Sequence, residues 1–184
     1  MSDWLSGLGP WLTAHPDLML PLLLSLGMAG CDLKTGRIPN YLTLGGALGG
    51  LVFQCGYQGL PGLLDGLAGL GLGFILLLGP YLLGGMGAGD VKASAALGAW
   101  LGLRRAFALF VYMGICGGLI ILVVLLWQGR LLGGIREGWN FLLNWLLCRP
   151  FDPKPLRPSS ARTTTIPYGV AMALGMAVLC WRPA

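Results

Sequence analysis

Charged residues are scarce in this chain. Only 10% of its 184 residues are Asp, Glu, Lys or Arg, whereas soluble domains carry about a quarter. Apolar residues make up 55%, and the mean hydropathy is +0.75. Glycine is abundant at 32 residues, but the high hydropathy excludes a polar, disordered chain. We therefore expect a membrane protein in which glycine lets the helices approach one another closely.

Paired cysteines and an N-terminal basic cluster are also missing. The five cysteines form no Cys-x-x-Cys pair of the kind found in zinc and redox sites. We expect neither a metal nor a cofactor, and we interpret the thiols as buried apolar groups. The start of the chain lacks the Lys/Arg cluster of a secretory signal peptide, so the first apolar stretch is predicted to be a retained span. The basic residues lie in short connections between apolar stretches, which argues against nucleic-acid binding.

Six apolar stretches predict an all-α, polytopic membrane protein with about six transmembrane helices, organised as one membrane-embedded domain over residues 1–184. The stretches cover residues 18–29, 41–56, 63–83, 93–103, 106–127 and 166–181. The fourth is short and rich in small residues, so we expect it to be buried among other helices and to gain length if its helix starts near Asp90. Residues 139–147 are predicted to form an interfacial helix, and the proline-rich residues 149–165 a loop.

The basic residues also predict an orientation. If the connections after the first, third and fifth stretches share one side of the membrane, that side holds most of the Lys and Arg residues. The richer side is expected to be cytoplasmic. Asp32 and Asp90 then face the same side.

Asp32 and Asp90 differ from the other acidic residues because each lies beside an apolar stretch on the same predicted face of the membrane. Asp32 closes the first stretch, and Asp90 opens the fourth after a glycine-rich turn. Ionisable residues at such depth are costly and are candidates for a functional site. The alternative is that each caps a helix or pairs with its neighbour, Lys34 or Lys92. The remaining acids, expected to be solvated at the membrane edge, are Asp3, Asp17, Asp65, Glu137 and Asp152.

Two facing carboxylates suit peptide hydrolysis. Like charges about 3 Å apart cannot both ionise, so the pair shares one proton. One carboxylate can then take a proton from water while its protonated partner polarises the scissile carbonyl. The pair titrates as a unit, so the sequence does not assign the two roles. Gly87 and Gly89 are expected to adopt backbone conformations closed to other residues and to let a substrate strand approach Asp90.

Four segments resemble one known family. DLKTGRIPN (32–40) is similar to the Asp-then-Ile/Leu-Pro-Asn/Asp signature of the type IV prepilin peptidases, and GAGDVK (87–92) is similar to their Gly-x-Gly-Asp-x-Lys signature. SAALGAWLG (94–102) and IPYGVAMALG (166–175) also resemble that family. A lone Gly-x-Gly-Asp is weakly specific, but its combination with the upstream motif and this hydropathy is strongly specific.

The resemblance implies a membrane aspartic endopeptidase that removes basic leader peptides from type IV prepilins or pseudopilins. It places the active site at the cytoplasmic edge of the bacterial inner membrane, without a metal or cofactor. Asp32 and Asp90 fall on the family's catalytic positions. The substrate-binding or supporting candidates that lie in the same two motifs are Gly87, Gly89, Lys92, Arg37, Pro39 and Asn40.

Some of these candidates keep two interpretations. Lys34, Arg37 and Lys92 are either cytoplasmic anchors, or one of them contacts an acidic group of the substrate or tunes the carboxylate pair. Pro39 is expected to set the start of the second span. The resemblance also implies that Pro167 and Tyr168 help to shape the site.

The chain resembles the short members of the family, which lack the N-terminal cytoplasmic cysteine domain and serve Flp-type or Tad pili. Methyltransferase activity is therefore not expected. Two other functions are alternatives. A small transporter would place its acids near mid-span, whereas these acids sit at span ends. A non-catalytic pilus or secretion assembly factor would not need either aspartate. The sequence does not define the particular pilin or the oligomeric state.

Overall fold

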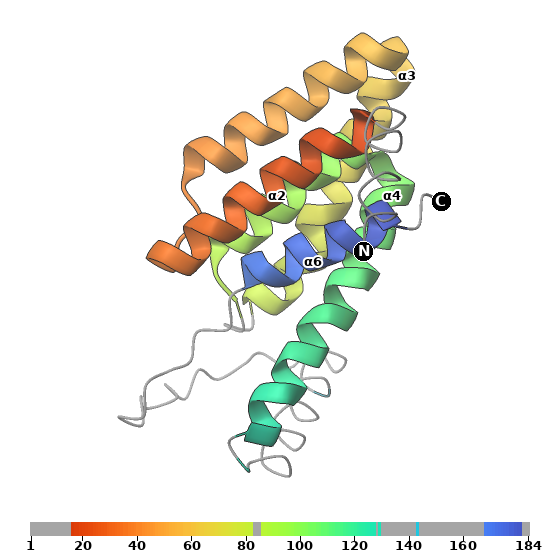
Figure 1. Ribbon diagram of the computed structural model, residues 1–184. Helices are drawn as coiled ribbons and strands as arrows, with labels where there is room; N and C mark the ends of the chain where they lie inside the picture. The colour runs from red at the N-terminus through yellow and green to blue at the C-terminus, as the bar shows by residue number, and fades with distance from the viewer. Residues whose placement is uncertain (1–15, 83–85, 128, 130–142, 144–167, 182–184) are drawn as a thin grey trace, which may run out of the picture.

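The computed structural model describes residues 16–82, 86–127, 129, 143 and 168–181. Its elements are the helices α2 (Pro16–Thr35), α3 (Asn40–Leu82), α4 (Ala88–Trp127) and α6 (Tyr168–Trp181) (Figure 1). The predicted all-α membrane fold is confirmed, because α2, α3 and α4 are long and apolar enough to cross a membrane. The number of six crossings stays a prediction.

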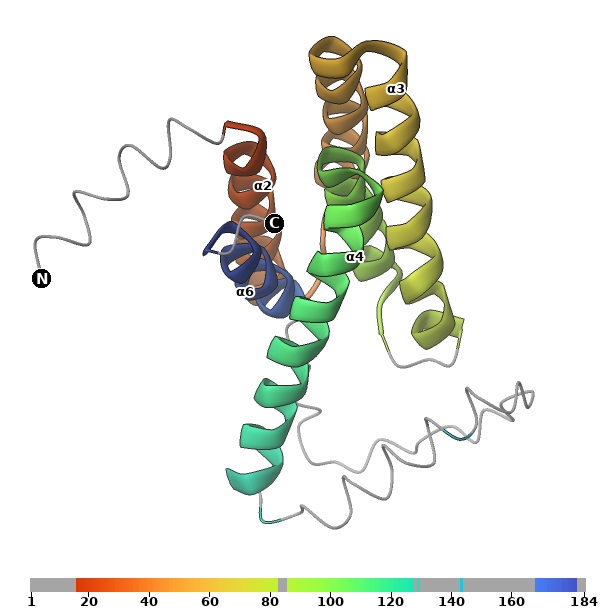
Figure 2. The same cartoon turned by 90° about the vertical axis from the view of Figure 1, so that its right-hand side faces the viewer.

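Glycines with positive φ break both long helices. Gly59 has φ 65° and ψ −146° within α3, and Gly102 has φ 73° and ψ 177° within α4. A residue without Cβ reaches these angles at little cost. The break at Gly59 folds α3 back on itself, so its two halves run side by side as the orange and yellow columns of Figure 2. Both breaks lie within a few residues of boundaries that hydropathy predicted between separate stretches.

The helix ends near the predicted site differ from the hydropathy boundaries. α2 continues through Thr35, so Asp32 and Lys34 lie on its last turn and not in the connection that was predicted. Gly36 ends α2 with φ 62°, and its N–H donates to the Asp32 carbonyl at 2.8 Å. This is a left-handed glycine cap. α4 begins at Ala88, before the apolar stretch, because polar and small residues extend the helix.

Small residues bring the second half of α3 against the first half of α4. A Cβ added to Gly69 would collide with the carbonyl oxygen of Gly98, and a Cβ on Gly98 would collide with that of Gly69. A Cβ on Gly73 would lie 2.5 Å from the carbonyl oxygen of Ser94. The main chains therefore touch directly, as is typical of membrane helices that pack through small residues.

Two side-chain hydrogen bonds join the first half of α3 to the first half of α4. The Trp100 Nε1–H donates to the carbonyl oxygen of Gly46 at 2.7 Å, and Gln54 Nε2 donates to the carbonyl oxygen of Trp100 at 3.0 Å. Within the described ranges, no buried side-chain nitrogen or oxygen lacks a hydrogen-bond partner. Burial of Gln54 in an apolar layer is therefore tolerated, because its amide is bonded.

α6 packs beside α2 and also contacts α4 (Figures 1 and 2). Gly175 lies against the main chain of Met113 on α4, and Gly169 lies against Asp32 on α2. Fully buried side chains from three helices, Met28, Leu97 and Met176, belong to the core between them. The last helix thereby joins α2 to α4, the two helices that carry Asp32 and Asp90.

Two acids expected to be solvated have specific partners. Asp65 Oδ1 accepts the Leu103 N–H at 3.1 Å, directly after the break at Gly102, so it caps the second half of α4. Asp17 forms an ion pair with Arg105, which links α2 to α4. Both side chains of that pair are about a third exposed, so we expect it to add little stability.

Replacing Asp65 by alanine should lower the free energy of unfolding by about 0.5–2 kcal/mol, the usual cost of losing a helix cap. Asn keeps an oxygen that can accept the Leu103 N–H, so Asp65→Asn is the matched control and should lose less. Thermal unfolding in detergent measures both. Equal melting temperatures for the wild type and Asp65→Ala would show that this cap contributes nothing.

Candidate functional site

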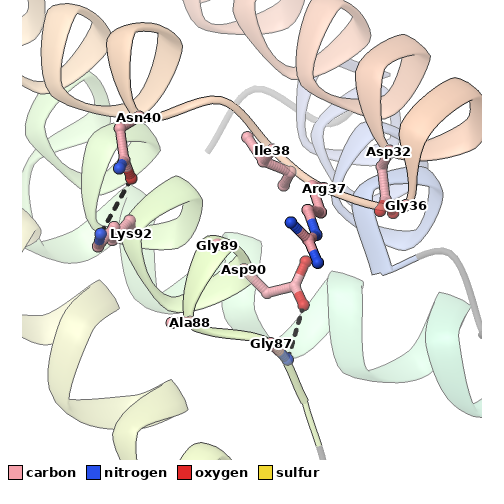
Figure 3. A pocket seen from close by; sticks show the side chains of 10 residues that line it. All are labelled: Asp32, Gly36, Arg37, Ile38, Asn40, Gly87, Ala88, Gly89, Asp90 and Lys92. Carbon is pink, nitrogen blue, oxygen red and sulfur yellow. Dashed lines mark hydrogen bonds between the residues drawn. The ribbon is translucent and has the colours of Figure 1, made fainter.

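A pocket of about 400 Å³ lies where the connection between α2 and α3 meets the start of α4 (Figure 3). The two predicted catalytic acids and the supporting candidates from the two motifs line it, with the exception of Pro39. The lining consists of Asp32, Gly36, Arg37, Ile38, Asn40, Gly87, Ala88, Gly89, Asp90 and Lys92. Its volume falls in the range of small-molecule and peptide sites, roughly 300–1,000 Å³.

Asp32 reaches the pocket from the last turn of α2, and it is half-buried. Its Oδ2 accepts the backbone N–H of Gly169 at 2.9 Å. Gly169 is the second residue of α6, and the first four N–H groups of a helix have no acceptor within it. The start of α6 therefore supplies a donor that holds the Asp32 carboxylate.

Asp90 reaches the pocket from the first turn of α4 and is 9% exposed. Its Oδ2 accepts the Gly87 N–H at 3.2 Å, and its own N–H donates to the Gly87 carbonyl at 3.1 Å. This reciprocal arrangement is a helix N-terminal cap in which the third residue reaches back. Asp90 therefore caps its helix, as one of the two interpretations from sequence expected. The same carboxylate also lines the pocket together with Asp32 (Figure 3).

Neither acid of the pocket is in an ion pair. Across the parts of the chain that the structure describes, the one salt bridge joins Arg105 to Asp17. The predicted alternative of pairing with Lys34 or Lys92 is therefore not seen. Two acids from separate helices face a single pocket without a cation bound to either, which is an unfavourable arrangement unless they share a proton or bind a ligand.

Basic side chains also line the pocket. Lys92 Nζ donates to Asn40 Oδ1 at 2.9 Å, and this exposed contact ties the start of α3 to α4. Arg37 is exposed, and Figure 3 shows its side chain beside Asp90. The pocket therefore presents both carboxylates and cations, a surface suited to a peptide with charges of both signs.

The role expected of Gly87 and Gly89 needs correction. Neither has a positive φ, and the pocket glycine that does is Gly36. Space is tight at Gly87, where a Cβ would lie 3.3 Å from Asp90 Oδ2, whereas a Cβ on Gly89 would make an ordinary contact, 3.5 Å from that of Ile38. Small size at these positions leaves room beside the carboxylate and lets the connection pack on α4.

Three pocket residues were missed from sequence. Gly36 directly follows the end of α2, a common position for a capping glycine. Ile38 is an apolar residue within a polar connection, and its side chain is only 8% exposed. These two features of the sequence could have indicated that Gly36 and Ile38 belong to the site. Ala88 carries no such signal, because its place in the lining depends only on where α4 begins.

The remaining site predictions lie beside the pocket or outside the described residues. The Pro39 carbonyl accepts N–H groups of Leu42 and Thr43 at 3.1 and 3.3 Å, so Pro39 sets the start of α3 as expected. Tyr168 begins α6, next to the glycine that contacts Asp32. Pro167, residues 149–165 and all of 139–147 except residue 143 are outside the described ranges.

Comparison with known proteins identifies the family. The model of the type IV leader peptidase family matches residues 18–122, more than half of the chain and all of the residues that line the pocket. The chain belongs to the type IV leader peptidase family. Membership confirms the resemblance and, at the level of the family, the expected enzyme class, a peptidase.

Two curated relatives agree with this assignment. The prepilin leader peptidase/N-methyltransferase of Xanthomonas campestris pv. campestris is 32% identical over 164 residues, which cover 85% of this chain and 46% of that protein. The leader peptidase HopD of Salmonella typhimurium is 32% identical over 152 residues, 74% of this chain and 97% of that protein. The chain therefore spans about half of the first relative and nearly all of the second. No solved structure gives a significant match.

Proposed function

We propose that this leader peptidase is an aspartic endopeptidase that removes the basic leader from type IV prepilins or pseudopilins, with Asp32 and Asp90 as its catalytic pair. Family membership supports the reaction class. One structural observation carries the assignment of residues. Two carboxylates from different helices line the same pocket, and neither is paired with a cation in the described residues.

The proposed reaction needs one proton between the two carboxyl groups. The ionised carboxylate takes a proton from a water molecule, whose oxygen attacks the scissile carbonyl carbon. The protonated carboxyl group donates to the carbonyl oxygen, and a proton passes to the amine as the C–N bond breaks. Water is consumed, a new carboxylate and a new N-terminus are formed, and the pair returns to its starting state.

The pocket lining suits a peptide main chain. Gly87 and Gly89 carry no side chain beside Asp90, so an extended segment can approach the carboxylate. Of the two interpretations of Arg37 and Lys92, their place in the lining favours contact with an acidic group of the substrate over a purely anchoring role. The bias of basic residues places this pocket at the cytoplasmic face, where a basic leader would remain.

The proposed substrates include Flp-type prepilins, on the resemblance of the two motifs to the short members of the family. Coexpression with prepilins and pseudopilins of the same genome tests the function directly. A shift to a smaller product on a gel, followed by N-terminal sequencing of that product, would locate the cut before the apolar helix. If none of these substrates is processed by the wild-type membrane protein, the proposed substrate class is wrong.

The contact between Lys92 and Asn40 gives a further prediction. Lys92→Met and Asn40→Ala should each lower kcat/KM for cleavage by about 5- to 10-fold, the equivalent of one ordinary hydrogen bond. Because both variants remove the same contact, the double variant should be no slower than the worse single one. Additive losses would show that the two side chains act independently.

A further inference from the structure

We propose that Gly169 is a positioning residue of the catalytic pair. Its backbone N–H orients the Asp32 carboxylate, and its lack of a side chain allows α6 to come close enough to do so. This inference rests on the proposed function and extends it to a third helix. It assigns α6 a role in the site although none of its residues lines the described pocket.

The contact joins parts of the chain that are 137 residues apart. Gly169 N donates to Asp32 Oδ2 at 2.9 Å, a normal length for a strong N–H to carboxylate bond. Asp90 is held in a parallel way, because the Gly87 N–H donates to its Oδ2. Each acid of the pair is therefore held by one backbone donor from the beginning of a helix, Asp32 from α6 and Asp90 from α4.

Close packing explains why residue 169 has to be glycine. A Cβ there would lie 2.9 Å from Asp32 Cβ, 3.0 Å from Asp32 Oδ2 and 3.1 Å from Ala29 Cα. Two of these atoms belong to the main chain or to the base of a side chain, so they cannot swing aside. Any side chain at 169 must push α6 away from α2 or turn the Asp32 carboxylate out of its place.

Orientation of Asp32 matters because the pair works only when both carboxyl groups face the same water and the same peptide bond. Asp32 is half-buried and can turn about its χ angles if the donor is lost. A displacement of about 1 Å at a reacting group can cost roughly 100-fold in rate. Binding of the peptide depends on the rest of the pocket, so kcat should fall more than KM rises.

The test compares two glycines of α6 in full-length protein. Gly169→Ala is expected to lower kcat for leader cleavage by about 100-fold with KM changed by less than about threefold. Gly175→Ala is the matched control, because its Cβ would lie 2.9 Å from Met113 N and 3.0 Å from Met113 Cα. It disturbs the packing of α6 as severely but on the α4 side, so it should lower the melting temperature while kcat, measured well below that temperature, stays near wild type.

A second variant removes the donor without adding an atom to the side chain. Glycolic acid in place of Gly169 turns the amide into an ester, which deletes the N–H and makes the Tyr168 carbonyl a somewhat weaker acceptor. Since this N–H lies in the first turn of α6, the ester breaks no hydrogen bond within the helix. We expect a loss of kcat similar to that of Gly169→Ala with a much smaller change in melting temperature.

Three results decide the matter. Equal losses of kcat in Gly169→Ala and Gly175→Ala, or full kcat in the ester variant, would overturn the positioning role. Asp32→Asn and Asp90→Asn are assayed in parallel. If they are inactive, the proposed function stands whatever happens at Gly169; if they cleave normally, the proposed function itself fails.

Discussion

Asn in place of Asp90 is expected to lower kcat for leader cleavage by about 10³-fold or more, and Asp32→Asn should do the same. General acid–base groups contribute about 10² to 10⁴ in rate, and members of a catalytic unit are often each indispensable. An amide can neither hold the shared proton nor take one from water. Because the two residues act as a unit, the double variant should be no slower than either single variant.

The Asn variants are chosen to leave the fold intact. An Asn oxygen at position 90 can still accept the Gly87 N–H that begins α4, and one at position 32 can still accept the Gly169 N–H. Loss of activity is therefore separable from loss of structure. Membrane yield and thermal unfolding of both variants should match the wild type. Asp65→Asn, which replaces an acid outside the pocket, serves as the control that should remain active. Cleavage by either pocket variant at more than a tenth of the wild-type rate would contradict the catalytic pair.

Gly69→Ala should be strongly destabilising, lowering the free energy of unfolding by about 3 kcal/mol. The new Cβ would collide with the Gly98 carbonyl oxygen and lie 2.7 Å from the Gly102 carbonyl carbon. Neither is the flexible end of a side chain, so α3 and α4 must separate. Since α4 carries Asp90 at its start, cleavage should fall together with stability.

Gly71→Ala is the matched control for that variant. It lies on the same half of α3, but its Cβ would have nothing within 4 Å. It should therefore unfold at or slightly above the wild-type temperature, because alanine loses less backbone freedom than glycine in a helix. Thermal unfolding of both variants in the same detergent measures the difference. Matching melting temperatures would show that α3 and α4 do not depend on direct main-chain contact.

Much of the fold could be predicted from the sequence because hydropathy is a local property. The apolar stretches yielded the all-α membrane class, and the breaks at Gly59 and Gly102 fall near predicted boundaries. The end of α2 was placed too early, since hydropathy reports where the apolar residues stop. The helix itself stops where Gly36 supplies a cap.

The candidate site was predicted in part for a similar reason. In a chain with so few charges, an acid that adjoins an apolar stretch is conspicuous, and the motifs around Asp32 and Asp90 pointed to the family. Asp65 is exposed as expected, but its bond to the Leu103 N–H was not predicted, because that group lies on another helix. Neither Gly87 nor Gly89 has the positive φ that a special backbone conformation would need, since φ depends on the turn actually formed, and at Gly87 it is the space beside Asp90 that is tight.

The amino-acid sequence by itself determined that this member of the leader peptidase family is built of membrane helices and that Asp32 and Asp90 stand in its two motifs, because hydropathy and local motifs depend on neighbours along the chain. Only the tertiary structure decided that Asp32 and Asp90 line one pocket and that Gly169 reaches Asp32 from α6. Those relations follow from how closely glycine lets distant helices pack, and no local pattern encodes that distance.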